Sequence, residues 1–120
     1  MPPGPQGHET EIALVGMRFH VRVGVLPHER ELPQPLEVDL AVRRDAGRSG
    51  VLDYRALWEL TSDTIANEPL TYLESLADVL AERALNMEGV HWCRVAIRKP
   101  HVVLGGPLAY AQVTVERVRA

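Results

Sequence analysis

The sequence has a single cysteine, no long apolar run and no excess of positive charge, and each shortage excludes a class of protein. One cysteine in 120 residues excludes a framework of intrachain disulfides and is typical of a reducing compartment. No apolar run approaches the roughly 20 residues that a membrane-spanning helix needs, and residues 1–7 lack the basic-then-apolar order of a secretion signal. The net charge of −3 comes from interspersed signs, which gives no footprint for nucleic acid. We therefore expect a soluble cytoplasmic protein with no nucleic-acid or membrane partner.

Metal-binding and phosphate-binding motifs are also missing. The five histidines never fall two apart on a predicted strand or four apart on a predicted helix, the spacings that direct two imidazoles at one ion. They are His8, His20, His28, His91 and His101. No glycine-rich loop leads from a strand into a helix, since Gly105 and Gly106 precede a strand and are typical of a turn. The sequence thus predicts neither a metal nor a cofactor.

The hydrophobic pattern predicts one domain, with residues 1–10 as a flexible leader and residues 11–120 as the folded part. Towards the end of residues 12–23, apolar and charged residues alternate as they do in a half-buried strand. The alternation is strict from Leu36 to about residue 45 and recurs over residues 93–99 and 110–116. In the second of these strands we expect one face inward (Leu36, Val38, Leu40, Val42) and the other outward (Glu37, Asp39, Arg43).

Two helices are predicted between the strand pairs. Asp53 is a suitable N-cap for a helix from Tyr54 to about residue 66, which Asn67-Glu-Pro ends. A second helix is predicted from Thr71 to about residue 86. The order ββααββ is typical of an α+β domain with two helices on one face of a four-stranded antiparallel sheet. Because two helices leave the sheet edges bare, the pattern also favours association between copies.

Lys99 is the one lysine among thirteen basic residues, the other twelve being arginine. It stands at the end of a predicted strand, on the face of Val95 and Ile97 and just before Pro100. A strand-end lysine ordinarily extends its ammonium into water and has no further role. An ammonium can lose its proton when desolvated, however, whereas a guanidinium cannot. The use of arginine everywhere else makes a chemical role for Lys99 an equally good interpretation.

Three other polar residues have a structural explanation beside a functional one. Glu29 lies in a proline-rich loop and is by itself most simply a solvated glutamate. Tyr54 follows the helix cap, where its ring is expected to pack on the sheet while its hydroxyl finds a partner. The segment from Thr71 to Glu74 matches the capping box, in which the glutamate bonds back to the cap amide. The residue pattern alone therefore favours a cap over a ligand for Glu74.

Six sequence blocks occur in a recognisable order and spacing. They are Gly16-Met-Arg-Phe19, Gly24-Val-Leu-Pro-His-Glu29, Gln34-Pro-Leu-Glu-Val-Asp-Leu40, Leu52-Asp-Tyr-Arg55, Tyr72-Leu-Glu74-Ser-Leu-Ala77-Asp and Arg98-Lys-Pro100. With these blocks the chain resembles the dihydroneopterin aldolase family, and the resemblance covers about residues 12–118. The resemblance implies the tunnelling fold, in which four subunits join their sheets into a barrel and two such rings usually stack. We accordingly expect a homo-tetramer or homo-octamer with active sites between subunits.

The resemblance also implies an activity and its residues. The family cleaves 7,8-dihydroneopterin by a retro-aldol reaction into 6-hydroxymethyl-7,8-dihydropterin and glycolaldehyde, a step toward folate, with neither a metal nor a Schiff base. Glu74, with the helix amides near Leu73, matches the carboxylate that holds the pterin. Lys99, acting with a water, matches the lysine that deprotonates the side-chain hydroxyl. Tyr54 of the neighbouring subunit matches the residue that helps reprotonate the enol, and Glu29 matches a loop glutamate near the reacting side chain.

The sequence departs from the family at three places. Asp53 stands where asparagine is common, Val102-Val103 replaces alanine-proline, and Val23 stands where histidine is common. None of these departures removes a group on which the predicted chemistry depends.

Two alternatives to the aldolase stay open. One is dihydroneopterin triphosphate 2′-epimerase, a sister with much the same glutamate, tyrosine and lysine. Arg43, Arg44 and Arg98 are the candidates for its triphosphate, although all three are equally explained as strand-surface charges. The other alternative is a non-catalytic pterin-binding module, which would need Glu74 but not Lys99.

Overall fold

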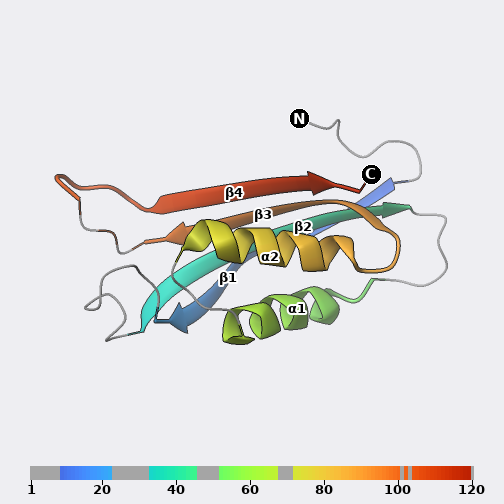
Figure 1. The fold of residues 1–120 in the computed structure, drawn as a ribbon, viewed down its shortest axis with the longest axis horizontal. Coiled ribbons are helices and arrows are strands. Elements are labelled where there is room, and N and C mark those ends of the chain that lie inside the picture. The colour runs from blue at the N-terminus through green and yellow to red at the C-terminus, as the bar shows by residue number, and fades with distance from the viewer. Residues whose placement is uncertain are drawn as a thin grey trace.

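The computed structural model describes residues 9–22, 33–45, 52–67, 72–100, 102 and 104–119. These residues form four strands and two helices in the predicted order ββααββ (Figure 1). The elements are β1 (Glu9–Val21), β2 (Gln34–Asp45), α1 (Tyr54–Asn67), α2 (Leu73–Leu85), β3 (Val90–Lys99) and β4 (Ala111–Val118).

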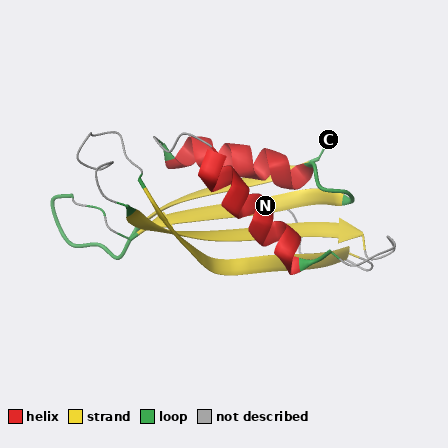
Figure 2. Cartoon of the chain, turned by 90° about the horizontal axis from the view of Figure 1, so that it is seen from below, coloured by secondary structure: helices red, strands yellow, loops and turns green. Residues whose placement is uncertain are grey.

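The four strands form one antiparallel sheet in the order β1-β2-β3-β4, so β1 and β4 are its edges. Both helices lie on the same face of this sheet, which confirms the predicted α+β arrangement (Figure 1). Seen from below, α2 runs nearly along the strands whereas α1 lies oblique to them (Figure 2). We call the opposite side of the sheet the helix-free face; it carries Glu11, Asp39, Arg43, Trp92 and Arg98. None of the described helices is long and apolar enough to cross a membrane.

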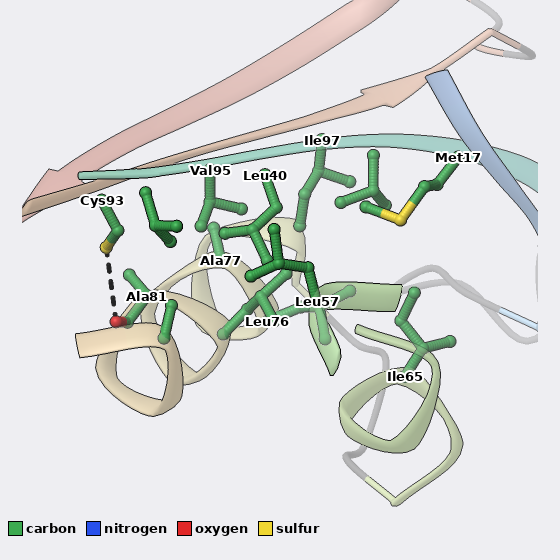
Figure 3. Packing of buried hydrophobic residues seen from close by; sticks show 14 of the residues in the cluster. Met17, Leu40, Leu57, Ile65, Leu76, Ala77, Ala81, Cys93, Val95 and Ile97 are labelled. Carbon is green, nitrogen blue, oxygen red and sulfur yellow. Dashed lines mark hydrogen bonds between the residues drawn. The ribbon is translucent and has the colours of Figure 1, made fainter. Parts of the chain in front are cut away.

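The hydrophobic core lies between the sheet and the helices. Leu40 points from the sheet toward Leu76 of α2 and Leu57 of α1, and all three side chains are fully enclosed (Figure 3). Burying a side chain of this size stabilises the fold by about 1.5–3 kcal/mol. The residues of β2 predicted to face inward are all buried, namely Leu36, Val38, Leu40 and Val42. The period-2 pattern thus gave the correct face.

The helix starts agree with the prediction in one case and differ in the other. The Asp53 carboxylate accepts a hydrogen bond from the Arg55 amide at 2.8 Å, so Asp53 is the N-cap of α1 as predicted. The N-cap of α2 is Tyr72, whose own side chain makes no capping hydrogen bond. Glu74 is therefore the second helical residue and not the third, so it does not stand at the capping-box position relative to this N-cap.

Two further expectations need correction. β1 begins at Glu9, so Glu9 and Thr10 belong to the sheet and not to the expected leader. Arg43 lies on the outward, helix-free face as predicted, but it is not a strand-surface charge, because it is only 8% exposed. Its guanidinium lies 4.0 Å from the centre of the Trp92 ring, and its Nε donates to the Glu11 carboxylate at 2.8 Å. Those two neighbours on adjacent strands cover it.

Candidate active site

One end of the sheet brings three of the predicted site residues to the same part of the molecule. Lys99 is the last residue of β3 and is half-buried. Leu73 and Glu74 are the first two residues of α2, whose first turn lies at the same end as the tip of β3 (Figure 1). Leu73 packs against the core, whereas Glu74 is exposed. An acidic side chain and an amine therefore stand at one edge of the fold.

The first turn of α2 offers hydrogen-bond donors beside this acidic side chain. The first four amides of a helix have no acceptor within the helix, and in α2 the N-cap Tyr72 supplies no side-chain acceptor for them. The Glu74 carboxylate can accept two hydrogen bonds, while the neighbouring amides can donate. Such a pairing is suited to a planar heterocycle that carries donors and an acceptor along one edge. Glu74 is exposed and stands at the second helical position, so its carboxylate can face such a ligand.

Tyr54 lies elsewhere in the chain. It is the first residue of α1 and is 65% exposed. It lines a cavity of about 500 Å³, and the other described residues along this cavity are Thr10, Ile12, Leu52 and Asp53. Asp53, the N-cap of α1, immediately precedes Tyr54, so the start of this helix forms one side of the cavity.

The strand register shows how far apart these two groups are. Ile12 of β1 pairs with Val42 of β2, and Val42 pairs with Cys93 of β3. From Cys93 to Lys99 is six residues along β3, which spans about 20 Å. Figure 1 likewise shows the start of α1 and the end of β3 at opposite ends of the sheet. Within one chain, Tyr54 therefore lies at the other end of the sheet from Lys99.

Glu29, the remaining predicted site residue, lies in residues 23–32, outside the described part of the chain. Its place near the site stays a prediction. Among the described residues, no group of three or more histidine, cysteine, aspartate or glutamate side chains gathers as metal ligands do.

The residue before Lys99 in β3 forms an ion pair that the sequence analysis did not single out. Two guanidinium nitrogens of Arg98 donate to the two oxygens of Asp39 at 2.7 and 2.8 Å. This pairing lowers the pKa of the Asp39 carboxyl below its ordinary value and raises that of Arg98. The same carboxylate accepts the Gly16 amide at 2.8 Å. The sequence did contain a signal for this contact. A glycine within a strand pattern suggests a bulge, and an outward aspartate on the next strand is a possible partner for its amide.

Comparison with known proteins identifies the family of the chain. The family model of dihydroneopterin aldolase (FolB) matches residues 12–116. The chain belongs to the dihydroneopterin aldolase family. Dihydroneopterin aldolase of Bacillus subtilis is 29% identical over 117 residues, covering 91% of this chain and 96% of its own length. The Streptomyces coelicolor enzyme is 30% identical over 115 residues, covering 90% and 97%. The activity is accordingly that of a dihydroneopterin aldolase.

Solved structures of dihydroneopterin aldolases share the fold. FolB of Vibrio cholerae superposes with a TM-score of 0.79 at 25% identity, covering 92% of this chain and 98% of its own. The Escherichia coli dihydroneopterin aldolase, solved in complex with neopterin, gives a TM-score of 0.78 at 21% identity, covering 90% and 98%. The predicted family is confirmed, as is the predicted fold of four antiparallel strands with two helices.

Proposed function

We propose that this aldolase cleaves 7,8-dihydroneopterin into 6-hydroxymethyl-7,8-dihydropterin and glycolaldehyde at sites shared between neighbouring subunits of a cytoplasmic homo-oligomer. The observation that carries the shared site is the separation of Tyr54 from Lys99 along the sheet. Two open edges, β1 and β4, support the oligomer, because each leaves a row of unpaired backbone groups. Pairing β4 of one copy with β1 of the next continues the sheet and closes a ring of four subunits, and two such rings would stack into an octamer.

Glu74 holds the pterin in this proposal. The substrate's ring N–H and amino group are adjacent donors, and one carboxylate accepts both. The amides at the start of α2, near Leu73, donate to acceptors on the same ring. The Escherichia coli relative binds neopterin, which has the same heterocyclic edge in an oxidised ring.

Lys99 starts the chemistry by taking a proton, with the help of a water, from the 2′-hydroxyl of the substrate. That oxygen then forms the carbonyl of glycolaldehyde as the bond between C1′ and C2′ breaks. The electron pair of this bond flows into the imine of the dihydropterin ring, which gives an enol. The ring is its own electron sink, so the mechanism needs no imine between the lysine and the substrate.

Tyr54 of the neighbouring subunit completes the reaction. Its phenol helps to deliver a proton to C1′ of the enol, which yields the hydroxymethyl product. The apolar walls of its cavity, Ile12 and Leu52, exclude water from the reacting side chain. Glu29 is expected to approach the same part of the substrate from its loop.

The two alternatives find less support in the described residues. Arg43 is committed to Glu11 and Arg98 to Asp39, and the two arginines lie on different parts of the sheet. Of the three arginines named as candidates for a triphosphate, Arg43 and Arg98 therefore do not meet in one basic cluster, and Arg44 adjoins only Arg43 along β2. A pterin-binding module without activity would have no use for an amine at the tip of β3.

The test is incubation of the protein with 7,8-dihydroneopterin followed by chromatography of the pterins. We expect 6-hydroxymethyl-7,8-dihydropterin from the parent, and a fall in kcat by a factor of about 10²–10⁴ in Lys99→Ala. Arg94→Ala, an exposed change on the helix-free face, is the control and should retain activity. Conversion to 7,8-dihydromonapterin without cleavage would identify the epimerase. Bound but unaltered pterin would identify a binding module.

A further inference from the structure

Asp39 ties three strands together on the helix-free face of the sheet. Arg98 of β3 binds both of its oxygens, and Gly16 of β1 donates its amide to one of them. The side chains of Arg98 and Asp39 are only 15% and 23% exposed. A bidentate, charge-assisted pair of this kind is about twice as strong per bond as a neutral one and fixes orientation as well.

The contact with β1 closes a β-bulge. The pairs Leu14–Leu40 and Met17–Val38 leave two residues of β1 opposite the single residue Asp39. Gly16 adopts a φ of 72°, the left-handed conformation that such bulges use. The Asp39 carboxylate satisfies the amide that the bulge removes from the ladder, so the shape of β1 and the position of Arg98 depend on one another.

Arg98 is also the last anchor of β3 before Lys99. In the register of the described strands, the final pair between β2 and β3 is Glu37 with Arg98, and the next residue, Lys99, is matched with Ala111 of β4. Pro100 follows and has no amide to continue the ladder. The Arg98 side chain reaches outward from this point, with its Nη1 lying 3.4 Å from the Gln112 amide oxygen of β4.

We infer that Asp39, acting through Arg98, is a positioning residue that aims Lys99 at the substrate. Successive side chains of a strand project to opposite faces of the sheet. When Asp39 holds the guanidinium of Arg98 on the helix-free face, the backbone at the end of β3 is fixed, and with it the direction in which the Lys99 side chain leaves the opposite face. The inference rests on the proposed role of Lys99. Asp39 itself touches no substrate, and its effect is on the rate and not on pterin binding, because Glu74 belongs to α2.

The sheet supplies a matched control. Glu11 and Arg43 form a second carboxylate–guanidinium pair on the same face, joined at 2.8 Å. Arg43 pairs with Trp92, seven residues before Lys99, so this pair cannot direct the end of β3. Asp39→Ala and Glu11→Ala each remove one carboxylate from a shielded arginine. Asp39→Asn, which keeps the shape and loses the charge, is the milder variant should the alanine variant fold poorly.

The experiment compares the parent, Asp39→Ala, Asp39→Asn and Glu11→Ala in two ways. Turnover of 7,8-dihydroneopterin gives kcat and KM. Isotopic labelling of lysine gives a single backbone amide signal in NMR, because Lys99 is the only lysine. We expect kcat to fall by about 10- to 100-fold in Asp39→Ala with KM nearly unchanged, and by less in Asp39→Asn. The lysine signal should shift and its hydrogen exchange accelerate in the Asp39 variants alone.

Two results overturn the inference. One is an unchanged kcat in Asp39→Ala, and the other is an equal loss of kcat in Glu11→Ala and Asp39→Ala at equal stability. Failure of the proposed function would look different, because the parent itself would then release no 6-hydroxymethyl-7,8-dihydropterin, and failure of the proposed role of Lys99 would leave Lys99→Ala active. The lysine signal would still report whether Asp39 holds the end of β3.

Discussion

Mixing two inactive variants tests the shared site most directly. Lys99→Ala removes the amine at the tip of β3, and Tyr54→Phe removes the phenol at the start of α1, at the opposite end of the sheet. In an oligomer of either variant alone, every site lacks one of the two groups and is inactive. In a mixed ring, a site is intact wherever the lysine comes from the tyrosine variant and the tyrosine comes from the lysine variant. Tyr54 is 65% exposed, so its substitution should not disturb folding.

The expected recovery follows from counting neighbours. In an equal mixture that assorts at random, half of the chains supply a good lysine, and half of their neighbours supply a good tyrosine. About one quarter of the sites should therefore regain parental activity. The assay is aldolase turnover after the two variants are refolded together over a range of ratios, with a maximum expected at equal amounts. Activity no higher than that of the separately refolded variants would refute the shared site.

Three further predictions concern single positions. Gly16→Ala should lower the free energy of unfolding, measured in urea, by about 1–2 kcal/mol, because a φ of 72° is strained for alanine. An added Cβ would meet no atom within 4 Å, so the loss would come from backbone strain and not from a clash. No loss would mean that the bulge adjusts freely. Arg98 holds the pKa of Asp39 below its usual 3.8, so this carboxylate stabilises the fold above that pH and the stabilisation is lost as the pH falls through the lowered pKa. Urea denaturation should accordingly show a stability gap between the parent and Asp39→Asn at neutral pH that shrinks in acid, and a constant gap would contradict the assignment. Burial raises the pKa of the Cys93 thiol to about 11, so a thiol reagent should react with it at neutral pH only after unfolding.

The secondary structure could be predicted because it depends on local patterns. Alternation in β2 gave the buried face, and the Asp53 cap gave the first residue of α1. The start of α2 was placed too early, at Thr71, because a capping-box pattern is short and occurs by chance. The burial of Arg43 depends on Glu11 and Trp92, which reach it only through the strand register. No pattern around Arg43 itself carries that information.

The site was harder to predict from the residues alone. Lys99 stood out because the chain otherwise uses arginine, whereas Tyr54 and Glu74 each had an adequate structural explanation and depended on the family resemblance. The Asp39–Arg98 pair joins residues 59 positions apart, so only the folded sheet brings it together. The separation of Tyr54 from Lys99 is also a property of the register, and it was expected only from the resemblance.

The opposite placement of the α1 start and the β3 tip has a genetic consequence. Under the shared-site arrangement, a chain that has lost both Lys99 and Tyr54 damages its own site and also its neighbour's. A cell making equal amounts of that chain and the normal one would keep about one quarter of its activity instead of one half. Such an allele would behave as a partial dominant negative, whereas an allele whose product never folds would simply halve the amount of enzyme.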